Sequence, residues 1–261
     1  PARDFSAIFS LPGHRSTAGP MAIADVDGDG DQDLFVGGRT VPARYPEPAD
    51  SQLFLNVNGE LKPDPANTKV LEKLGLVSGA VFGDLDGDGD ADLVLALEWG
   101  PIKVLRNDAG KFTDATRELG LDSYKGWWNS VTLGDLDTDG RLDIIAGNWG
   151  LNSKYAHAYS KKHPLRMAYS DFDKNGVVDI VEYHFDKMTR KMVPERGRSC
   201  TTRAMPFIGK RNETFSLFGE RSLDEVYGPS LKEATVLEAN ILAHTLFLNR
   251  GNKFEARALP A

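Results

Sequence analysis

A nine-residue acidic pattern that occurs four times constrains this chain more than any other feature. The pattern is D-x-D-x-[DN]-G-x-x-D, and it begins at residues 25, 84, 135 and 171. Carboxylates crowded into so short a segment repel one another, and without a cation this repulsion lowers stability. Oxygen ligands at positions 1, 3, 5 and 9, with a glycine at position 6 for the sharp turn, suit a hard cation of calcium's size. The sequence therefore predicts about four calcium ions, one in each loop.

Positions 1, 3, 5, 7 and 9 of each loop supply the expected ligands. Position 7 holds an arginine in the third loop and a valine in the fourth, so we expect this position to contribute its backbone carbonyl. The predicted ligand residues are Asp25, Asp27, Asp29, Asp31, Asp33, Asp84, Asp86, Asp88, Asp90, Asp92, Asp135, Asp137, Asp139, Arg141, Asp143, Asp171, Asp173, Asn175, Val177 and Asp179.

An EF-hand is a different calcium loop, with a bidentate glutamate at position 12 and flanking helices. Position 12 is Val36, Leu95 or Ala146 in the first three loops, which excludes an EF-hand there. The fourth loop has Glu182 at this position, but the segment 177–185 is rich in β-branched and aromatic residues and is typical of a strand. We expect each loop to join two strands. Glu182 then reflects strand alternation, with a role as an additional ligand as the alternative.

A second element recurs after the loops and predicts further strands. The segments 53–56, 104–107 and 246–249 each end in an asparagine, and a turn and an aromatic strand follow the second and third of them. Two strands around the loop and two after it make a four-stranded unit at about the spacing of a propeller blade. We therefore predict an all-β protein, a β-propeller of about four blades in a single domain (1–261), with blades at 13–64, 65–118, 119–160 and 161–261.

The last two predicted blades are irregular. The third is too short for four strands, so we expect its outer edge to be incomplete, and the fourth contains an insertion at about 186–240. A capping box at Ser222–Glu225, with Gly228 placed to end the helix, predicts a short helical segment there. The chain ends, 5–12 and 254–260, resemble each other. Either the blades close on themselves or the chain is a piece of a longer array with further blades.

The acidic loops, followed by Leu-Phe-Leu-Asn and Gly-x-Phe segments, resemble the FG-GAP/VCBS repeats that build the propellers of integrin α-subunits and of bacterial surface proteins. The segments 126–130 and 147–152 are similar to bacterial relatives of cartilage acidic protein. The resemblance implies calcium ligation by loop positions 1, 3, 5 and 9. Asn175 departs from the usual aspartate at position 5, which implies a weaker fourth site.

Other kinds of chemistry find little support in the sequence. The single cysteine, Cys200, excludes an internal disulfide, and no zinc pair, P-loop, Rossmann fingerprint or G-x-S-x-G elbow occurs. No apolar run approaches the ~20 residues of a membrane span, and no signal peptide is visible at the first residues. We expect no membrane insertion.

Two tryptophans are candidates for ligand binding. Trp99 and Trp149 both follow the strand that leaves an acidic loop, and at matching places they could stack on sugar rings. Packing between neighbouring blades is the alternative. The loops hold 17 of the 38 acidic residues, which leaves 21 acidic against 31 basic residues, an excess of ten positive charges elsewhere. This favours an acidic polysaccharide or a protein as partner. Nucleic acid is not expected, because the chain lacks basic runs interleaved with aromatic residues.

We expect a non-catalytic binding or adhesion scaffold in an extracellular, cell-surface or periplasmic setting, where millimolar calcium loads weak sites. The first alternative is a calcium-dependent polysaccharide lyase or hydrolase. Such an enzyme needs a tyrosine, histidine or carboxylate pair that converges on one face, for which Tyr45, Tyr155 and His184 are candidates by residue type alone. The second alternative is a structural spacer in a larger secreted protein.

Overall fold

Each of the four acidic loops joins two antiparallel strands, as expected from the β-branched residues on either side of it. The computed structural model describes residues 11–156, 159–160 and 162–260. The strand pairs around the loops are β1 (Thr17–Ala24) and β2 (Asp33–Thr40), β5 (Leu76–Gly83) and β6 (Asp92–Gly100), β10 (Ser130–Gly134) and β11 (Asp143–Gly147), and β12 (Leu165–Ser170) and β13 (Asp179–Asp186).

Each pair belongs to a different one of four antiparallel sheets, so the predicted all-β class is confirmed. The first sheet adds β3 (Gln52–Val57) and β4 (Glu60–Pro63), and the second adds β7 (Ile102–Asp108) and β8 (Lys111–Asp114), with the short β9 (Gly126–Trp127) paired to β6. The third adds β16 (Thr245–Asn249) and β17 (Phe254–Ala258). The fourth has the order β14-β13-β12-β15, with β14 (Lys191–Pro194) and β15 (Thr235–Ala239) at its edges.

The strand pairing corrects the predicted boundaries of the last two units. Residues 245–258 were predicted to belong to the fourth blade, but β16 pairs with β11 of the third sheet at Ile144↔Phe247 and Ala146↔Thr245. The third sheet is therefore complete, and the fourth sheet is inserted between its two halves. The physical reason is that a bare edge of β11 would expose unpaired backbone groups, which the distant β16 satisfies.

The helices lie almost entirely within the predicted insertion. They are α2 (Arg198–Ala204), α3 (Pro206–Arg211), α4 (Phe215–Glu220), α5 (Leu223–Tyr227) and the 3-10 helix η1 (Gly228–Glu233), with α1 (Thr68–Leu71) elsewhere. The predicted capping box is present, because the Ser222 side chain accepts from the Glu225 N–H and Glu225 accepts from the Ser222 N–H. Gly228 ends α5 with a φ of 73°, a conformation that favours glycine. Within the described residues, no helix is long and apolar enough to cross a membrane.

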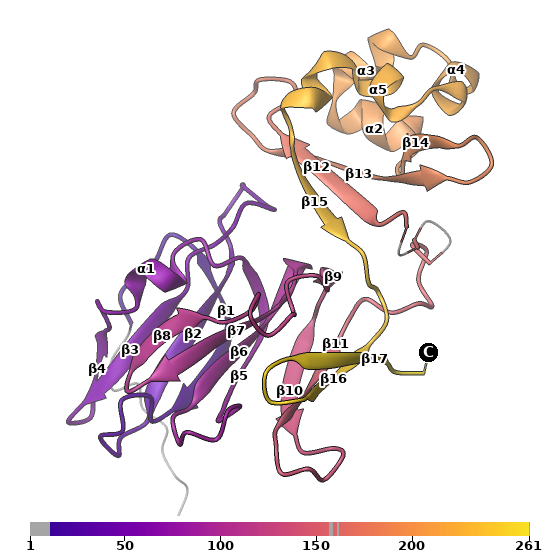
Figure 1. The fold of residues 1–261 in the computed structure, drawn as a ribbon. Coiled ribbons are helices and arrows are strands. Elements are labelled where there is room, and N and C mark those ends of the chain that lie inside the picture. Colours follow the sequence, from indigo (N-terminus) through magenta and orange to yellow (C-terminus); the bar gives the residue numbers. More distant parts are fainter. Residues whose placement is uncertain (1–10, 157–158, 161, 261) are drawn as a thin grey trace, which may run out of the picture.

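The first three sheets pack face to face in succession, with β1 and β2 against β5, and β5 and β6 against β10 (Figure 1). Apolar clusters fill both interfaces. Phe35 and Leu53 of the first sheet meet Leu93 and Leu95 of the second, and the opposite face of the second sheet meets Ile144 and Phe247 of the third. The helices cover one face of the fourth sheet in a separate cluster.

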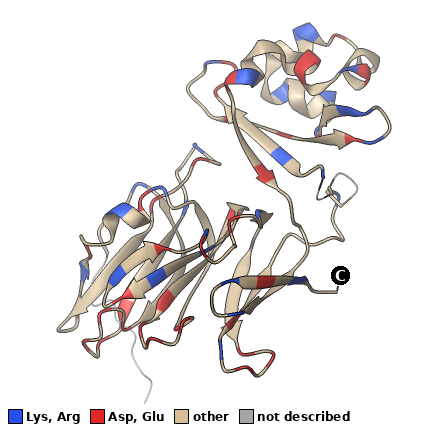
Figure 2. Cartoon of the chain, viewed as in Figure 1, with Lys and Arg blue, Asp and Glu red and all other residues tan. Residues whose placement is uncertain are grey.

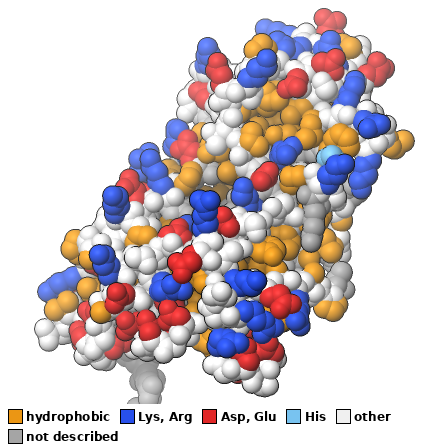
Figure 3. Space-filling model, in the orientation of Figure 1, with side chains coloured by type: hydrophobic (Ala, Val, Ile, Leu, Met, Phe, Trp, Pro, Cys, Tyr) orange, Lys and Arg blue, Asp and Glu red, His pale blue; other side chains and the backbone are white. Residues whose placement is uncertain are grey.

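The acidic side chains gather at one end of the packed sheets. The loops of the first three sheets emerge together, and Figure 2 shows their acidic residues along the same end. In the space-filling view, red atoms crowd the lower edge of the molecule below these sheets (Figure 3). The fold therefore concentrates acidic residues on one edge, where a few arginines lie among them.

Candidate metal loops

The four loops share most of their internal hydrogen bonds. The position-1 aspartate accepts two backbone N–H bonds in each loop. One comes from the position-6 glycine: Gly30 N donates to Asp25 Oδ2 at 2.9 Å, and the equivalent glycine donates at 2.8–3.0 Å in the other three loops. The other comes from position 4 in the first two loops and from position 5 in the last two. The position-5 side chain accepts from the N–H of position 7. Because every loop is folded by its own carboxylates, its side-chain oxygens face a common centre.

Three carboxylates converge in each loop. One oxygen from each of three aspartates lies within 4.8 Å of the other two, and positions 1 and 3 belong to every group. The groups are Asp25, Asp27 and Asp29; Asp84, Asp86 and Asp92; Asp135, Asp137 and Asp143; and Asp171, Asp173 and Asp179. Hard oxygen donors at this spacing fit a cation such as calcium. The structure thus brings together most of the predicted acidic ligands.

The position-9 aspartate also clamps the backbone. Asp92 accepts from the Leu85 N–H at 3.0 Å and, with its other oxygen, from the Asn107 N–H at 2.8 Å. Asp143 makes the same pair of bonds to Leu136 and Asn249. The carboxylate therefore ties its own loop to the third strand of the sheet. Sequence reasoning assigned these asparagines only to turns, although their place after each Leu-Phe-Leu segment was the available signal.

Burial opposes the ionisation of four loop carboxylates, Asp33, Asp86, Asp92 and Asp179. Desolvation raises the pKa of Asp92 to about 6, with Asp86 and Asp88 raising it further, although two backbone N–H bonds act in the opposite direction. Desolvation also raises the pKa values of Asp33, Asp86 and Asp179, with neighbouring aspartates as a further cause. A cation among these groups would offset both the burial and the mutual repulsion.

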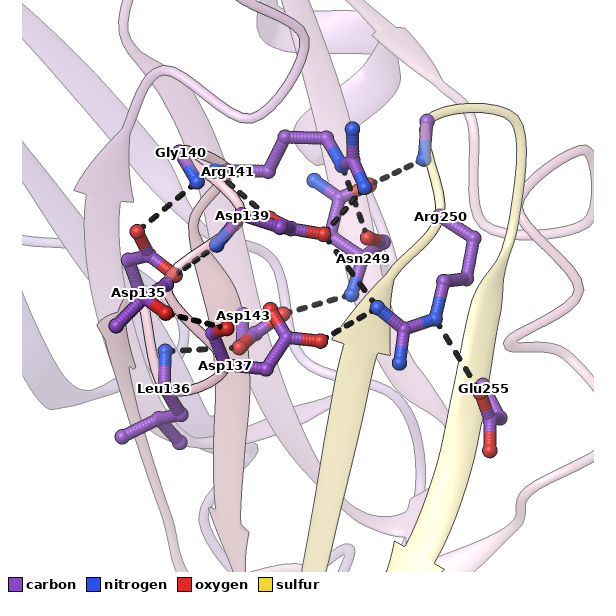
Figure 4. Close-up of polar contacts among 12 residues, drawn as sticks. Asp135, Leu136, Asp137, Asp139, Gly140, Arg141, Asp143, Asn249, Arg250 and Glu255 are labelled. Atoms are coloured by element: carbon purple, nitrogen blue, oxygen red, sulfur yellow. Dashed lines mark hydrogen bonds and ion pairs between the residues drawn. The ribbon is translucent and has the colours of Figure 1, made fainter.

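Basic side chains already neutralise part of the third loop (Figure 4). Arg250, in the turn between β16 and β17, lies 2.6 Å from Asp137 Oδ2 and 3.4 Å from Asp139 Oδ2. Its hydrogen bond to Asp137 holds the pKa of that carboxyl below its usual range. Arg141, at position 7, pairs with Asp139 and donates to the Asn249 carbonyl. Sequence reasoning missed the two Arg250 pairs because Arg250 lies more than a hundred residues after the loop in the chain.

The remaining position-7 side chains differ from loop to loop. Asp90 accepts from the Ala109 N–H at 2.7 Å and so holds the β7–β8 turn against the second loop. Asp31 and Val177 are exposed. The predicted contribution of the position-7 carbonyl stays a prediction. Glu182 is outside the fourth loop's acidic group, and it accepts from the Tyr155 hydroxyl at 2.8 Å.

The two candidate tryptophans belong to one aromatic stack. Trp127 lies between them, with ring centroids 4.8 Å from Trp99 and 4.2 Å from Trp149. Trp99 is 4% exposed and donates through Nε1 to the Tyr45 hydroxyl, so its ring packs inside the protein and offers no face to a ligand. This corrects its predicted role in stacking. Trp149 is 41% exposed, and its position is compatible with ligand contact.

The residues considered for an enzyme are held by buried carboxylates. Tyr45 donates to Glu98 at 2.6 Å, Tyr155 donates to Glu182, and His184 Nδ1 lies 2.6 Å from Glu195 Oε2. Burial is the main cause that raises the pKa of both tyrosines. Each pair joins two chain segments, so its immediate role is to fix loops onto the sheets.

Comparison with known proteins agrees with the repeat architecture. The FG-GAP-like repeat family matches the chain twice, at residues 25–95 and 84–146. The first match contains the first two acidic loops and the second contains the second and third loops. No curated protein matches the chain. The resemblance inferred from the acidic loops is thereby confirmed for residues 25–146, which contain FG-GAP-like repeats.

Proposed function

We propose that this chain is a calcium-stabilised β-propeller segment that serves as a non-catalytic binding scaffold outside the cell, at its surface or in the periplasm. The observation that carries the proposal is the convergence of three carboxylates in each of four loops, which share most of their internal hydrogen bonds. A single acidic cluster is common on protein surfaces. Four equivalent ones, at the same place in four sheets, are consistent with one shared ligand.

Calcium would act mainly on stability. Each loop connects two adjacent strands of its sheet, and the position-9 aspartates hold the third strand in the first three sheets. A cation that binds only the folded loop adds its binding free energy to folding. For sites of the weak extracellular class, with Kd ~10⁻⁴–10⁻³ M, ~10 mM calcium corresponds to about 1.4–2.7 kcal/mol per site.

The scaffold role rests on the surface that the loops leave free. The basic excess outside the loops favours an acidic polysaccharide or an acidic protein surface as partner. Trp149 is the exposed end of the tryptophan stack, and Lys154 lies nearby over the Tyr155 ring, 4.6 Å from its centroid. An aromatic face beside an ammonium group suits an anionic sugar.

Thermal unfolding tests the calcium proposal. The protein is stripped with EDTA and melted, and calcium or magnesium is then titrated back at constant ionic strength. We expect a rise in Tm that saturates with calcium and a much smaller rise with magnesium, which demands tighter octahedral geometry. Equal melting curves with EDTA and with 10 mM calcium would overturn the proposal.

A screen of acidic glycans tests the scaffold role. Saturable binding without a change in the glycan supports a scaffold, and product formation detected by chromatography supports the polysaccharide-active alternative. If neither occurs, the spacer alternative is favoured. Trp149→Ala is the matched variant, because the exposed ring can be removed with little effect on the core.

A further inference from the structure

A repeated joint connects each packed sheet to the next. The residue at position 2 of each acidic loop is apolar, and in the first two loops it is buried in the interface with the following sheet: Val26 in the first interface and Leu85 in the second. The backbone carbonyl of the same residue accepts a side-chain amide from the following sheet. Asn107 Nδ2 donates to Val26 O and Asn249 Nδ2 donates to Leu85 O, both at 2.8 Å. The joint thus combines an apolar contact with one hydrogen bond.

The fourth loop shows that this contact is covered even where no sheet follows. Its position-2 residue, Phe172, is buried in the cluster beneath the helices, with its ring centroid 6.2 Å from that of Tyr227. The helical insertion therefore takes the place of a following sheet. Three of the four position-2 side chains are buried in this way.

The third loop is the exception. Leu136, its position-2 residue, is 49% exposed. Ile145 and Leu246 lie on the same face of the third sheet and are only half-buried, whereas their equivalents in the first sheet, Phe35 and Leu53, are fully buried against a neighbour. We call this face, defined by Leu136, Ile145 and Leu246, the Leu136 face. It has the pattern of a joint that lacks its second half.

The surface that matches this incomplete joint lies on the first sheet, at the other end of the row of packed sheets. Met21 and Ile23 of β1 are 56% and 64% exposed. They stand four and two residues before their loop, as do Val131 and Leu133 of the third sheet, which pack against the second sheet. We call the face defined by Met21, Ile23, Leu34 and Val36 the Met21 face. A hollow of about 400 Å³ lies on it, lined in part by Met21 and Val36.

The first sheet also has a side-chain amide that lacks such a partner within the described residues. Asn56 matches Asn107 and Asn249, since its backbone N–H donates to the position-9 aspartate, Asp33, at 2.8 Å. Among the described residues, its side-chain amide has no loop carbonyl of a preceding sheet to meet. The first sheet therefore offers an apolar face and an amide, and the third offers an apolar side chain and a carbonyl.

We propose that two copies of this chain associate head to tail, with the Leu136 face of one on the Met21 face of the other. In this joint Leu136 packs between the two sheets and its carbonyl accepts from Asn56 of the second copy. A second copy is the occupant that the structure favours, because both halves of the joint are present on one chain and repeat a contact already made twice within it. Such a heterologous contact uses different patches on the two copies.

Complementation between two disrupted variants tests the joint. Leu136→Asp places a charge on the Leu136 face, and Ile23→Asp places one on the Met21 face. Both positions are exposed enough to accept a charge without loss of the fold. Masses are measured by light scattering after size exclusion, in calcium buffer and over a wide concentration range, with circular dichroism to verify folding. The control is Met188→Asp, which is 92% exposed and remote from both faces.

We expect the wild type and the control to self-associate, and each face variant alone to be monomeric. An equimolar mixture of the two face variants should form a dimer of twice the monomer mass, because one intact joint remains. Asn56→Ala should weaken wild-type association at least several-fold. A wild type that stays monomeric at several hundred micromolar, or a mixture that stays monomeric, overturns the inference. Because calcium binding is measured separately, either result leaves the proposed function untouched.

Discussion

Asn249 donates its side-chain amide to the carbonyl of Leu85, a residue in the loop of the neighbouring sheet and 164 positions earlier in the chain. The same side chain also donates to Leu142 in its own sheet, at 3.2 Å. A single buried asparagine thus links an acidic loop, the third strand of a sheet and the interface between two sheets. Loop folding and sheet packing are coupled through it.

This coupling predicts the effect of Asn249→Ala. The substitution leaves the buried Leu85 carbonyl and the half-buried Leu142 carbonyl without this donor, which should lower the free energy of unfolding by about 1–3 kcal/mol. The measurement is urea unfolding in calcium buffer. Asn56→Ala, at dilute protein concentration, is the control, because Asn56 occupies the same strand position without a loop carbonyl of a preceding sheet among the described residues. Equal losses for the two variants would contradict the role of the joint.

Arg250 should reduce the stabilisation that the third loop gains from a bound cation. It pairs with Asp137 and Asp139, so Arg250→Gln removes positive charge from among the carboxylates. We expect a slightly lower Tm in EDTA, because solvent-screened ion pairs contribute little to stability, and a larger gain in Tm on calcium addition.

Arg257→Gln serves as the control for this experiment. Arg257 pairs with Glu255 and touches no loop carboxylate. If the calcium-induced gain in Tm is the same for Arg250→Gln, Arg257→Gln and wild type, Arg250 has no influence on the metal loop.

Asp92→Asn should distinguish the effect of carboxylate repulsion on stability from the effect of calcium binding. The Asp92 carboxylate is buried close to Asp86 and Asp88, and its raised pKa reflects the cost of its charge there. The neutral side chain retains an acceptor for one backbone bond, so we expect a stability in EDTA close to that of wild type. The calcium-induced rise in Tm should be smaller, because a charged ligand is lost. Asp108→Asn, at an exposed position outside the loop, should leave the rise unchanged.

Much of this architecture follows from the sequence because the loop pattern is local. Position 6 needs a glycine where φ is positive, as at Gly30 with φ of 94°, and β-branched residues before and after the loops form the two strands that each loop joins. The acidic groups at positions 1 and 3 are fixed by the same nine residues. Such features depend on neighbours in the chain and can be read from spacing alone.

The features that escaped prediction depend on distant partners. The Leu-Phe-Leu-Asn segment at 246–249 identifies a third strand, but nothing in it tells which free edge it joins, and it joins β11 rather than the fourth sheet. Trp99 and Trp149 both lie near the end of the strand that leaves an acidic loop, and packing against Trp127 and Tyr45 buries Trp99 while Trp149 stays exposed. Burial of Phe172 under the helices is equally invisible to a local pattern.

The binding role predicts different outcomes for the two candidate tryptophans. Trp149→Ala should weaken the binding of an acidic glycan at least several-fold with little change in Tm, since an exposed ring is lost. Trp99→Ala should lower stability by about 3–5 kcal/mol through a core cavity. Glycan affinity measured by calorimetry, beside melting curves, distinguishes the two effects. An unchanged affinity for Trp149→Ala would remove this residue from the ligand site.

The calcium content of the folded protein tests the central claim most directly. Native mass spectrometry and calorimetric titration of the EDTA-stripped chain should both show about four calcium ions, with the Asn175 loop filling last because it has one charge fewer. Saturation at four ions with no comparable uptake of magnesium is the result that the account predicts. A folded chain that takes up no calcium at millimolar concentration would contradict it.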